Sequence, residues 1–60
     1  MTYVYILVGV QKDGTVTNLR YYLRYEAAEH ALHKLEDQQD PDYDPQQFKD
    51  VYIDHIEVME

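Results

Sequence analysis

The stretch from Thr2 to Leu23, TYVYILVGV-QKDG-TVTNLRYYL, decides the fold of this chain. Residues 2–10 and 15–23 are rich in β-branched and aromatic side chains, which favour strands. Between them, Asp13 and Gly14 are typical of a tight hairpin turn, because glycine readily adopts the positive φ that such turns need. The sequence therefore predicts an antiparallel hairpin made of strands 2–10 and 15–23.

A helix is predicted after the hairpin, at about residues 25–38. Tyr25, Ala28, Leu32 and Leu35 recur at the spacing of one helical stripe. Glu36 and Asp37 stand at the far end of this helix, where the helix dipole disfavours acids. Helix stability therefore does not explain their position.

The rest of the chain is predicted to form a loop and a last strand. Residues 39–47 contain both prolines and several acids, which is typical of an acidic loop. Residues 49–58 alternate as a strand does, but the alternation slips between Ile53 and Ile56, which predicts a bulge near Asp54 and His55.

The order of these elements is β-β-α-β, and sixty residues make a single domain, 1–60. We expect an α+β fold, in which one helix packs on one face of a three-stranded antiparallel sheet. The first strand lies in the centre, so the strand order is 2-1-3.

The two faces of this sheet differ in composition. Side chains alternate across a strand, and we assign the aliphatic set of the first strand (Val4, Ile6, Val8 and Val10) to the helix side. The uncovered side then forms an apolar patch, which usually marks an interface. This predicted dimer or partner face consists of Tyr3, Tyr5, Leu7, Val16 and Tyr22.

Oligomerisation is expected on grounds of size. A chain this short has a marginal core, and disulfides, metals or association are the usual remedies. The chain has no cysteine, which excludes disulfides and thiolate metal sites. A homodimer packed sheet to sheet is therefore the first expectation for this face, and direct binding of another protein is the second.

Negative charge is concentrated in one half of the chain. From Glu36 to Glu60 there are nine acids and one base, a net charge of −8, whereas Met1 to Leu35 carry three acids and four bases, a net of +1. Such a protein repels nucleic acid and anionic membranes and attracts basic protein surfaces. We expect a partner-binding acidic edge made of Glu36, Asp37, Asp40, Asp42 and Asp44.

Asp40, Asp42 and Asp44 alternate as the first ligands of an EF-hand do. The match fails at position six, which is Pro45 instead of glycine, and at position twelve, which is Val51 instead of glutamate. The alternatives are a solvated acidic loop or a recognition loop. In an extended segment, alternate side chains lie roughly 6.6 Å apart, similar to the spacing of successive DNA phosphates.

Features that would indicate an enzyme are scarce. The chain lacks cysteine and serine, and its two glycines do not form a phosphate-binding loop. His30 and His33 could share a metal, but exposed polar positions on a helix explain them more simply. We expect no catalysis, no metal and no cofactor. No apolar run approaches the ~20 residues of a membrane span, so we expect a soluble, cytoplasmic protein.

The chain resembles the short uracil-DNA glycosylase inhibitors of some phages. The similarity lies in the β-β-α-β order, the Asp13-Gly14 hairpin, the tyrosine-rich second strand and the Tyr-Ile-Asp-His-Ile run at 52–56. The acidic, proline-containing loop from Glu36 to Asp44 departs from that family. The resemblance implies a homodimer that presents acidic side chains as a DNA mimic, with an apolar pocket for a protruding residue of the target.

These observations give three functional hypotheses. The first is a phage-type anti-defence protein that inhibits a host nucleic-acid-processing enzyme by binding its basic surface, in the cytoplasm of the host cell. The second is a structural or regulatory homodimer whose acidity serves solubility. The third is a module that binds a small ligand or a metal through its histidines.

Overall fold

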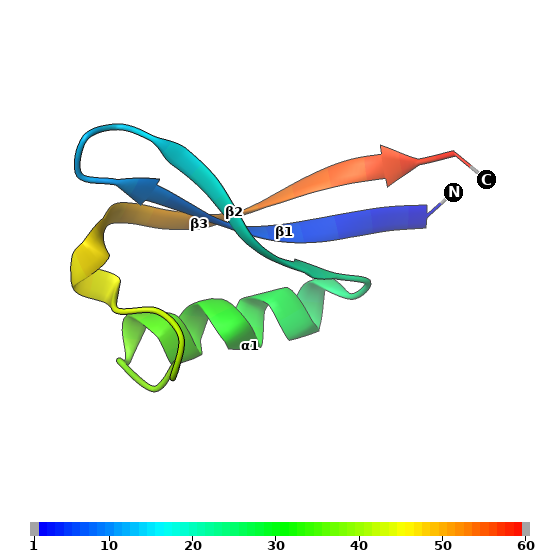
Figure 1. Cartoon of the computed structure of the whole chain (residues 1–60). Coiled ribbons are helices and arrows are strands. Elements are labelled where there is room, and N and C mark those ends of the chain that lie inside the picture. Colours follow the sequence, from blue (N-terminus) through cyan, green and yellow to red (C-terminus); the bar gives the residue numbers. More distant parts are fainter. Residues whose placement is uncertain (1, 60) are drawn as a thin grey trace.

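The structure, a computed structural model, describes residues 2–59 as one helix over a three-stranded antiparallel sheet (Figure 1). The strands are β1 (Thr2–Gln11), β2 (Val16–Tyr22) and β3 (Phe48–Val58), and the helix is α1 (Tyr25–Glu36). The strand order β2-β1-β3 confirms the predicted architecture. A short 3-10 helix, Pro45–Gln47, lies within the predicted loop.

The hairpin turn forms as its sequence predicts. The N–H of Gln11 donates to the carbonyl of Thr15 at 2.8 Å, and the N–H of Gly14 donates back to Gln11 at 2.9 Å. Gly14 has a φ of 95°, a conformation that glycine adopts without steric cost. The carboxylate of Asp13 accepts the N–H of Thr15, and this hydrogen bond lowers the pKa of Asp13.

The predicted bulge near Asp54 and His55 is wrong. β1 and β3 pair without interruption from Thr2–Val58 to Val10–Asp50, and the register shifts only beyond Val10. The apparent slip in the apolar pattern arises because both faces of β3 are apolar in part: Ile53 pairs with Leu7 on the helix side, whereas Ile56 lies on the opposite face.

The assignment of the sheet faces is also wrong. Leu7 is fully buried against Ala31 and Leu35 of α1, and Tyr22 packs against the same cluster. The helix therefore covers the face that was predicted to be free. Of the predicted dimer or partner face, Tyr3, Tyr5, Leu7 and Tyr22 are on the helix side. Only Val16, which pairs with Val10, lies on the uncovered face.

Connection handedness accounts for this arrangement. β2 and β3 run parallel on either side of β1, so α1 forms a crossover connection between them. Such crossovers are right-handed in nearly all proteins. For this strand order and register, a right-handed crossover places the helix on the face of Leu7. Topology, and not the hydrophobicity of the two faces, thus selects the covered side.

A close contact on the helix side explains the glycine within β1. A Cβ atom added to Gly9 would lie 2.7 Å from two ring atoms of Phe48 and 3.2 Å from a methyl group of Leu19. Leu19 stands at a register shift in β2, between Arg20, which pairs with Leu7, and Asn18, which pairs with Val8. Gly9 therefore leaves room for the half-buried ring of Phe48 on the helix side of the sheet.

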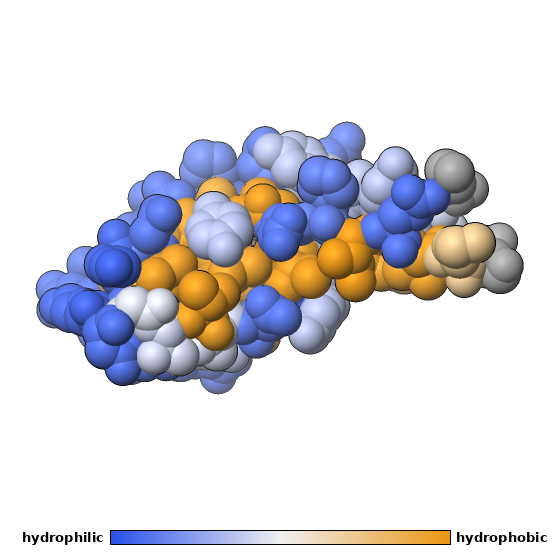
Figure 2. All heavy atoms as spheres, turned by 90° about the horizontal axis from the view of Figure 1, so that it is seen from above, coloured by the Kyte–Doolittle hydropathy of each residue, from blue (hydrophilic) through white to orange (hydrophobic). Residues whose placement is uncertain are grey.

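The uncovered face, called the open face from here on, carries an apolar stripe. Figure 2 views the molecule from the side opposite to α1 and shows this stripe running along the sheet. Ile6 and Val8 in its centre are buried, whereas Val16, Tyr21 and Ile56 are about half exposed. By the strand register, the apolar residues of the open face are Val4, Ile6, Val8, Val10, Val16, Tyr21, Tyr52, Ile56 and Val58.

The helix ends in a left-handed residue that is not glycine. Gln38 has a φ of 60°, and the N–H groups of Gln38 and Gln39 donate to the carbonyls of Leu35 and Lys34 at 3.1 and 2.9 Å. This pattern is a Schellman motif, which satisfies carbonyls that the helix leaves unpaired. Glycine is the residue that usually occupies the left-handed position.

Replacing Gln38 with glycine is therefore expected to stabilise the protein, by about 0.5–1 kcal/mol, because it removes the steric cost of the left-handed conformation. Urea unfolding followed by circular dichroism would measure the change. Gln38→Ala serves as the control and should not stabilise, because alanine keeps the Cβ atom. A glycine variant less stable than the alanine variant would contradict this account.

Candidate functional site

The segment between α1 and β3, residues 37–47, is held in place by one buried carboxylate. The side chain of Asp40 is only 1% exposed. One of its oxygens accepts the N–H of Asp42 at 2.8 Å, and the other accepts Nη1 of Arg20 at 2.9 Å. A buried carboxylate needs such partners, because its desolvation is costly. Asp40 thus joins the segment to the sheet.

Arg20 is the centre of this connection. Its guanidinium bonds both Asp40 and Asp42, and it lies 5.3 Å from the centre of the Tyr43 ring. The Tyr43 hydroxyl in turn donates to the carbonyl of Leu19, at 3.4 Å. Two carboxylates and an aromatic ring from the segment therefore meet a single base from β2, which orders the segment between them.

The charge of Asp40 is stabilised despite its burial. Desolvation, the largest single influence, opposes ionisation, but the hydrogen bond from the Asp42 N–H and the positive charge of Arg20 together outweigh it. The pKa of Asp40 therefore lies below its ordinary value of 3.8. Asp40 is a structural anion and is not available to a partner.

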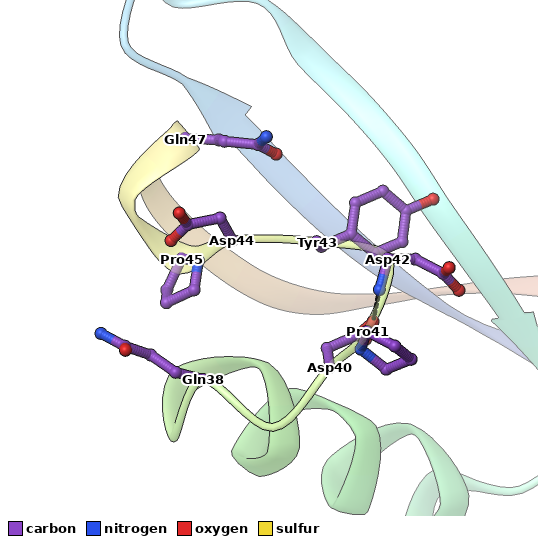
Figure 3. Close-up of a pocket in the computed structure, with 8 residues that line it drawn as sticks. All are labelled: Gln38, Asp40, Pro41, Asp42, Tyr43, Asp44, Pro45 and Gln47. Atoms are coloured by element: carbon purple, nitrogen blue, oxygen red, sulfur yellow. Dashed lines mark hydrogen bonds between the residues drawn. The ribbon is translucent and has the colours of Figure 1, made fainter.

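The loop is bent rather than extended. Figure 3 shows that the side chains of Asp42 and Asp44 point in opposite directions, with the Tyr43 ring turned toward the sheet. Asp44 caps the 3-10 helix by accepting the N–H of Gln46 at 2.9 Å. These residues surround a shallow hollow of about 340 Å³. The 6.6 Å ladder of acids expected of an extended segment is therefore not formed.

The predicted acidic edge is altered at two positions. Glu36, Asp37, Asp42 and Asp44 are exposed as predicted, but Asp40 is turned inward. Asp50 at the start of β3 was missed; it is exposed and lines a second hollow together with Glu36 and Lys49. The acidic edge, as the term is used from here on, consists of Glu36, Asp37, Asp42, Asp44 and Asp50.

Of the acids in this edge, only Asp42 is paired with a base in the part of the chain that the structure describes. Within residues 2–59, the only ion pairs closer than 4.0 Å are those of Arg20 with Asp40 and Asp42. Lys49 lies beside the edge and forms neither of these ion pairs.

Two features of the sequence could have revealed the inward turn of Asp40. An arginine inside an apolar hairpin needs an anion as a partner. In addition, Asp-Pro-Asp favours a turn in which the first carboxylate accepts a backbone N–H two residues further along the chain.

The tyrosines of β1 form a separate cluster near the start of α1. The ring of Tyr5 contacts Tyr25 at 5.6 Å and His55 at 6.4 Å, and Tyr3 contacts His55 at 5.7 Å. Tyr3 and Tyr25 remain 40% and 50% exposed. These tyrosines can therefore make contacts with a partner, although on the helix side of the sheet.

The residues considered for metal binding are not brought together. His30 and His33 are exposed on α1, whereas His55 is engaged with tyrosine rings on β1. Throughout the described part of the chain, no three histidine, aspartate or glutamate side chains are grouped so that they could hold a metal ion. The same residues include no helix with the length and apolarity needed to span a membrane.

Comparisons of the chain with protein-family models, with curated proteins and with solved structures find no match.

Proposed function

We propose that this protein is a small acidic inhibitor, of the kind that phages use against host defences. It binds the basic, nucleic-acid-binding surface of a host enzyme and so prevents that enzyme from reaching DNA or RNA. The observation that carries the proposal is the acidic edge, where five exposed carboxylates from three segments gather at one end of the molecule. Surfaces that bind phosphates are basic, so such an edge attracts them.

The anchored loop supports this function. Because Arg20 and Asp40 fix the segment that carries Asp42 and Asp44, these acids are ordered before a partner arrives. Preorganised groups lose less conformational entropy on binding, which favours affinity. Charge also supplies a fast encounter between the acidic edge and a basic surface.

Acidity that served solubility alone would not need this distribution. Charge for solubility works when it is dispersed over the surface. Here, Glu36 and Asp37 stand at the C-terminal end of α1, where the dipole works against them. A local cost to stability at the place where acids gather favours a binding role for them.

The test compares two double variants that remove the same charge from opposite ends of α1. Glu36→Gln with Asp37→Asn changes the acidic edge, and Glu26→Gln with Glu29→Gln is the matched control. Each is titrated into complexes of fluorescent duplex DNA with a panel of nucleic-acid-processing enzymes that begins with uracil-DNA glycosylase. The measurement is displacement of DNA between about 50 and 200 mM salt, where such contacts respond most.

We expect the wild type to displace DNA from its target with an affinity that falls as salt increases. The edge variant should bind about tenfold more weakly and with a smaller salt dependence, while the control changes by less than about twofold. Equal losses of affinity in the two variants would show that the overall charge matters and that the position of the acids does not. A wild type that displaces DNA from none of the enzymes would contradict inhibition by this route.

A further inference from the structure

The open face of the sheet has no covering element in the described chain, although its centre is apolar. We propose that two copies of the protein pair through their open faces, around a two-fold axis that runs parallel to the strands and passes between the two β1 strands. This inference rests on the fold alone. It does not depend on the proposed function, because Tyr21 and Asp54, which the pairing brings together, are not members of the acidic edge.

Several large apolar side chains of the open face are exposed to solvent. Tyr21, Val16 and Ile56 are 61%, 58% and 48% exposed around the stripe of β1. Contiguous apolar patches of this kind mark interaction sites. The buried apolar core is also small: it comprises Ile6, Leu7, Val8, Ala28, Ala31 and Leu35.

The strand register arranges the open face in rows across the sheet. Residues that pair in an antiparallel sheet stand side by side on one face. Ile6 pairs with Tyr21 on one side and Asp54 on the other, which makes one row. The next row holds Asn18, Val8 and Tyr52.

A two-fold axis along β1 places the same row of the two copies face to face. The order of the residues across the sheet is reversed in the second copy. Tyr21 then faces Asp54 of the second copy, while Ile6 meets Ile6. In the next row, Asn18 faces Tyr52 of the second copy across Val8. Long side chains meet short ones, and the only acid of these rows meets a phenol. In the row nearest the hairpin turn, Val16 faces Asp50 of the second copy across Val10, and the carboxylate of Asp50 bonds the N–H of Val51 at the sheet edge. The two central rows are therefore complementary to themselves, as an isologous interface requires.

The hydrogen-bonding state of these groups fits the same pairing. The Tyr21 hydroxyl accepts from Nδ2 of Asn18 at 3.4 Å, which leaves its own proton free to donate. Asp54 accepts the N–H of His55 through Oδ1 at 2.8 Å, which leaves Oδ2 free to accept. A donor and an acceptor thus remain at the two positions that the axis brings together.

Association through the edge of β3 is disfavoured. The carboxylates of Asp50 and Asp54 accept the N–H groups of Val51 and His55 at 2.9 and 2.8 Å. These N–H groups would otherwise be offered to a strand of another molecule. Acids placed along an edge are a known protection against such pairing. The second copy is therefore expected on the face and not at this edge.

Charge reversal at Tyr21 and Asp54 tests the pairing. Tyr21→Glu would face Asp54 of the second copy and repel it, and adding Asp54→Lys to the same chain would turn that repulsion into attraction. Tyr25→Glu is the matched control, because it makes the same substitution at a similarly exposed residue on the helix side. Sedimentation equilibrium and light scattering give the dimer Kd over about 1–500 μM, and circular dichroism confirms folding.

We expect a dimeric wild type, and a Kd that rises at least about a hundredfold in Tyr21→Glu. The Asp54→Lys addition should restore the affinity to within about tenfold of the wild type, and Tyr25→Glu should leave it unchanged. A monomeric wild type at the highest concentration would overturn the proposal. A dimeric Tyr21→Glu variant, a folded double variant that stays monomeric, or dissociation by Tyr25→Glu would also overturn it.

Discussion

Replacing Asp40 with asparagine is expected to lower the free energy of unfolding by about 2 kcal/mol. Removing one partner of a buried ion pair costs about 3–5 kcal/mol, because the other charge loses its compensation. We take about half of this cost, since Arg20 is one-third exposed and keeps its bond to Asp42. Urea unfolding measures the change.

Asp42→Asn is the matched control, because Asp42 binds the same guanidinium but is 67% exposed. Exposed ion pairs contribute little, so this variant should lose less than about 0.5 kcal/mol. Equal losses in the two variants would show that burial of Asp40 is not what matters.

The pH dependence of stability gives an independent check on the same carboxylate. The folded pKa of Asp40 lies below its ordinary value of 3.8, so its contribution is present above that value and is lost as the pH falls through the folded pKa. The wild type should therefore lose stability below about pH 4. In Asp40→Asn, which has no ionisable group at this position, the free energy of unfolding should fall less over the same pH range.

Replacing Gly9 with alanine is expected to cost about 2 kcal/mol, because the added methyl group would lie 2.7 Å from the ring of Phe48. Extra atoms at a closely packed position typically cost about 1–3 kcal/mol. Thermal and urea unfolding would measure the loss. Because the cause is a steric clash, the loss of stability in Gly9→Ala should depend on the presence of the Phe48 ring.

Phe48→Val tests this cause, since valine lacks the two ring atoms that a Cβ at position 9 would meet. The double variant should be more stable than the sum of the two single losses predicts, because residues in contact are not additive. Strict additivity would mean that Gly9 matters for backbone reasons and not for the place of Phe48.

The fold could be predicted from local signals because those signals agree. The Asp13-Gly14 turn, the two flanking runs of strand-forming residues and the helical stripe of Ala28, Leu32 and Leu35 each indicate the observed element. The side on which the helix lies could not be predicted by comparing the apolar content of the faces. Both faces of β1 are apolar, and the handedness of the crossover decides between them.

The candidate site was predicted in part for a related reason. Charge counted along the sequence located the acidic segment, but it could not distinguish an acid that faces solvent from one that neutralises a base. Asp40 and Asp42 both bond Arg20, about twenty positions away in the chain, but only Asp40 is buried, with its side chain 1% exposed against 67% for Asp42. Asp50 joins the edge because β3 begins beside the end of α1.

The central position of β1 also determines when these surfaces come into being. Its pairing with β2 closes a short hairpin, whereas its pairing with β3 joins residues as distant as Thr2 and Val58. Long loops close more slowly, so we expect β3 to dock last during folding. Asp50 and Asp54 reach their places only with β3. The complete acidic edge and the self-complementary rows are therefore gained in the final folding step, and a partly folded chain has neither.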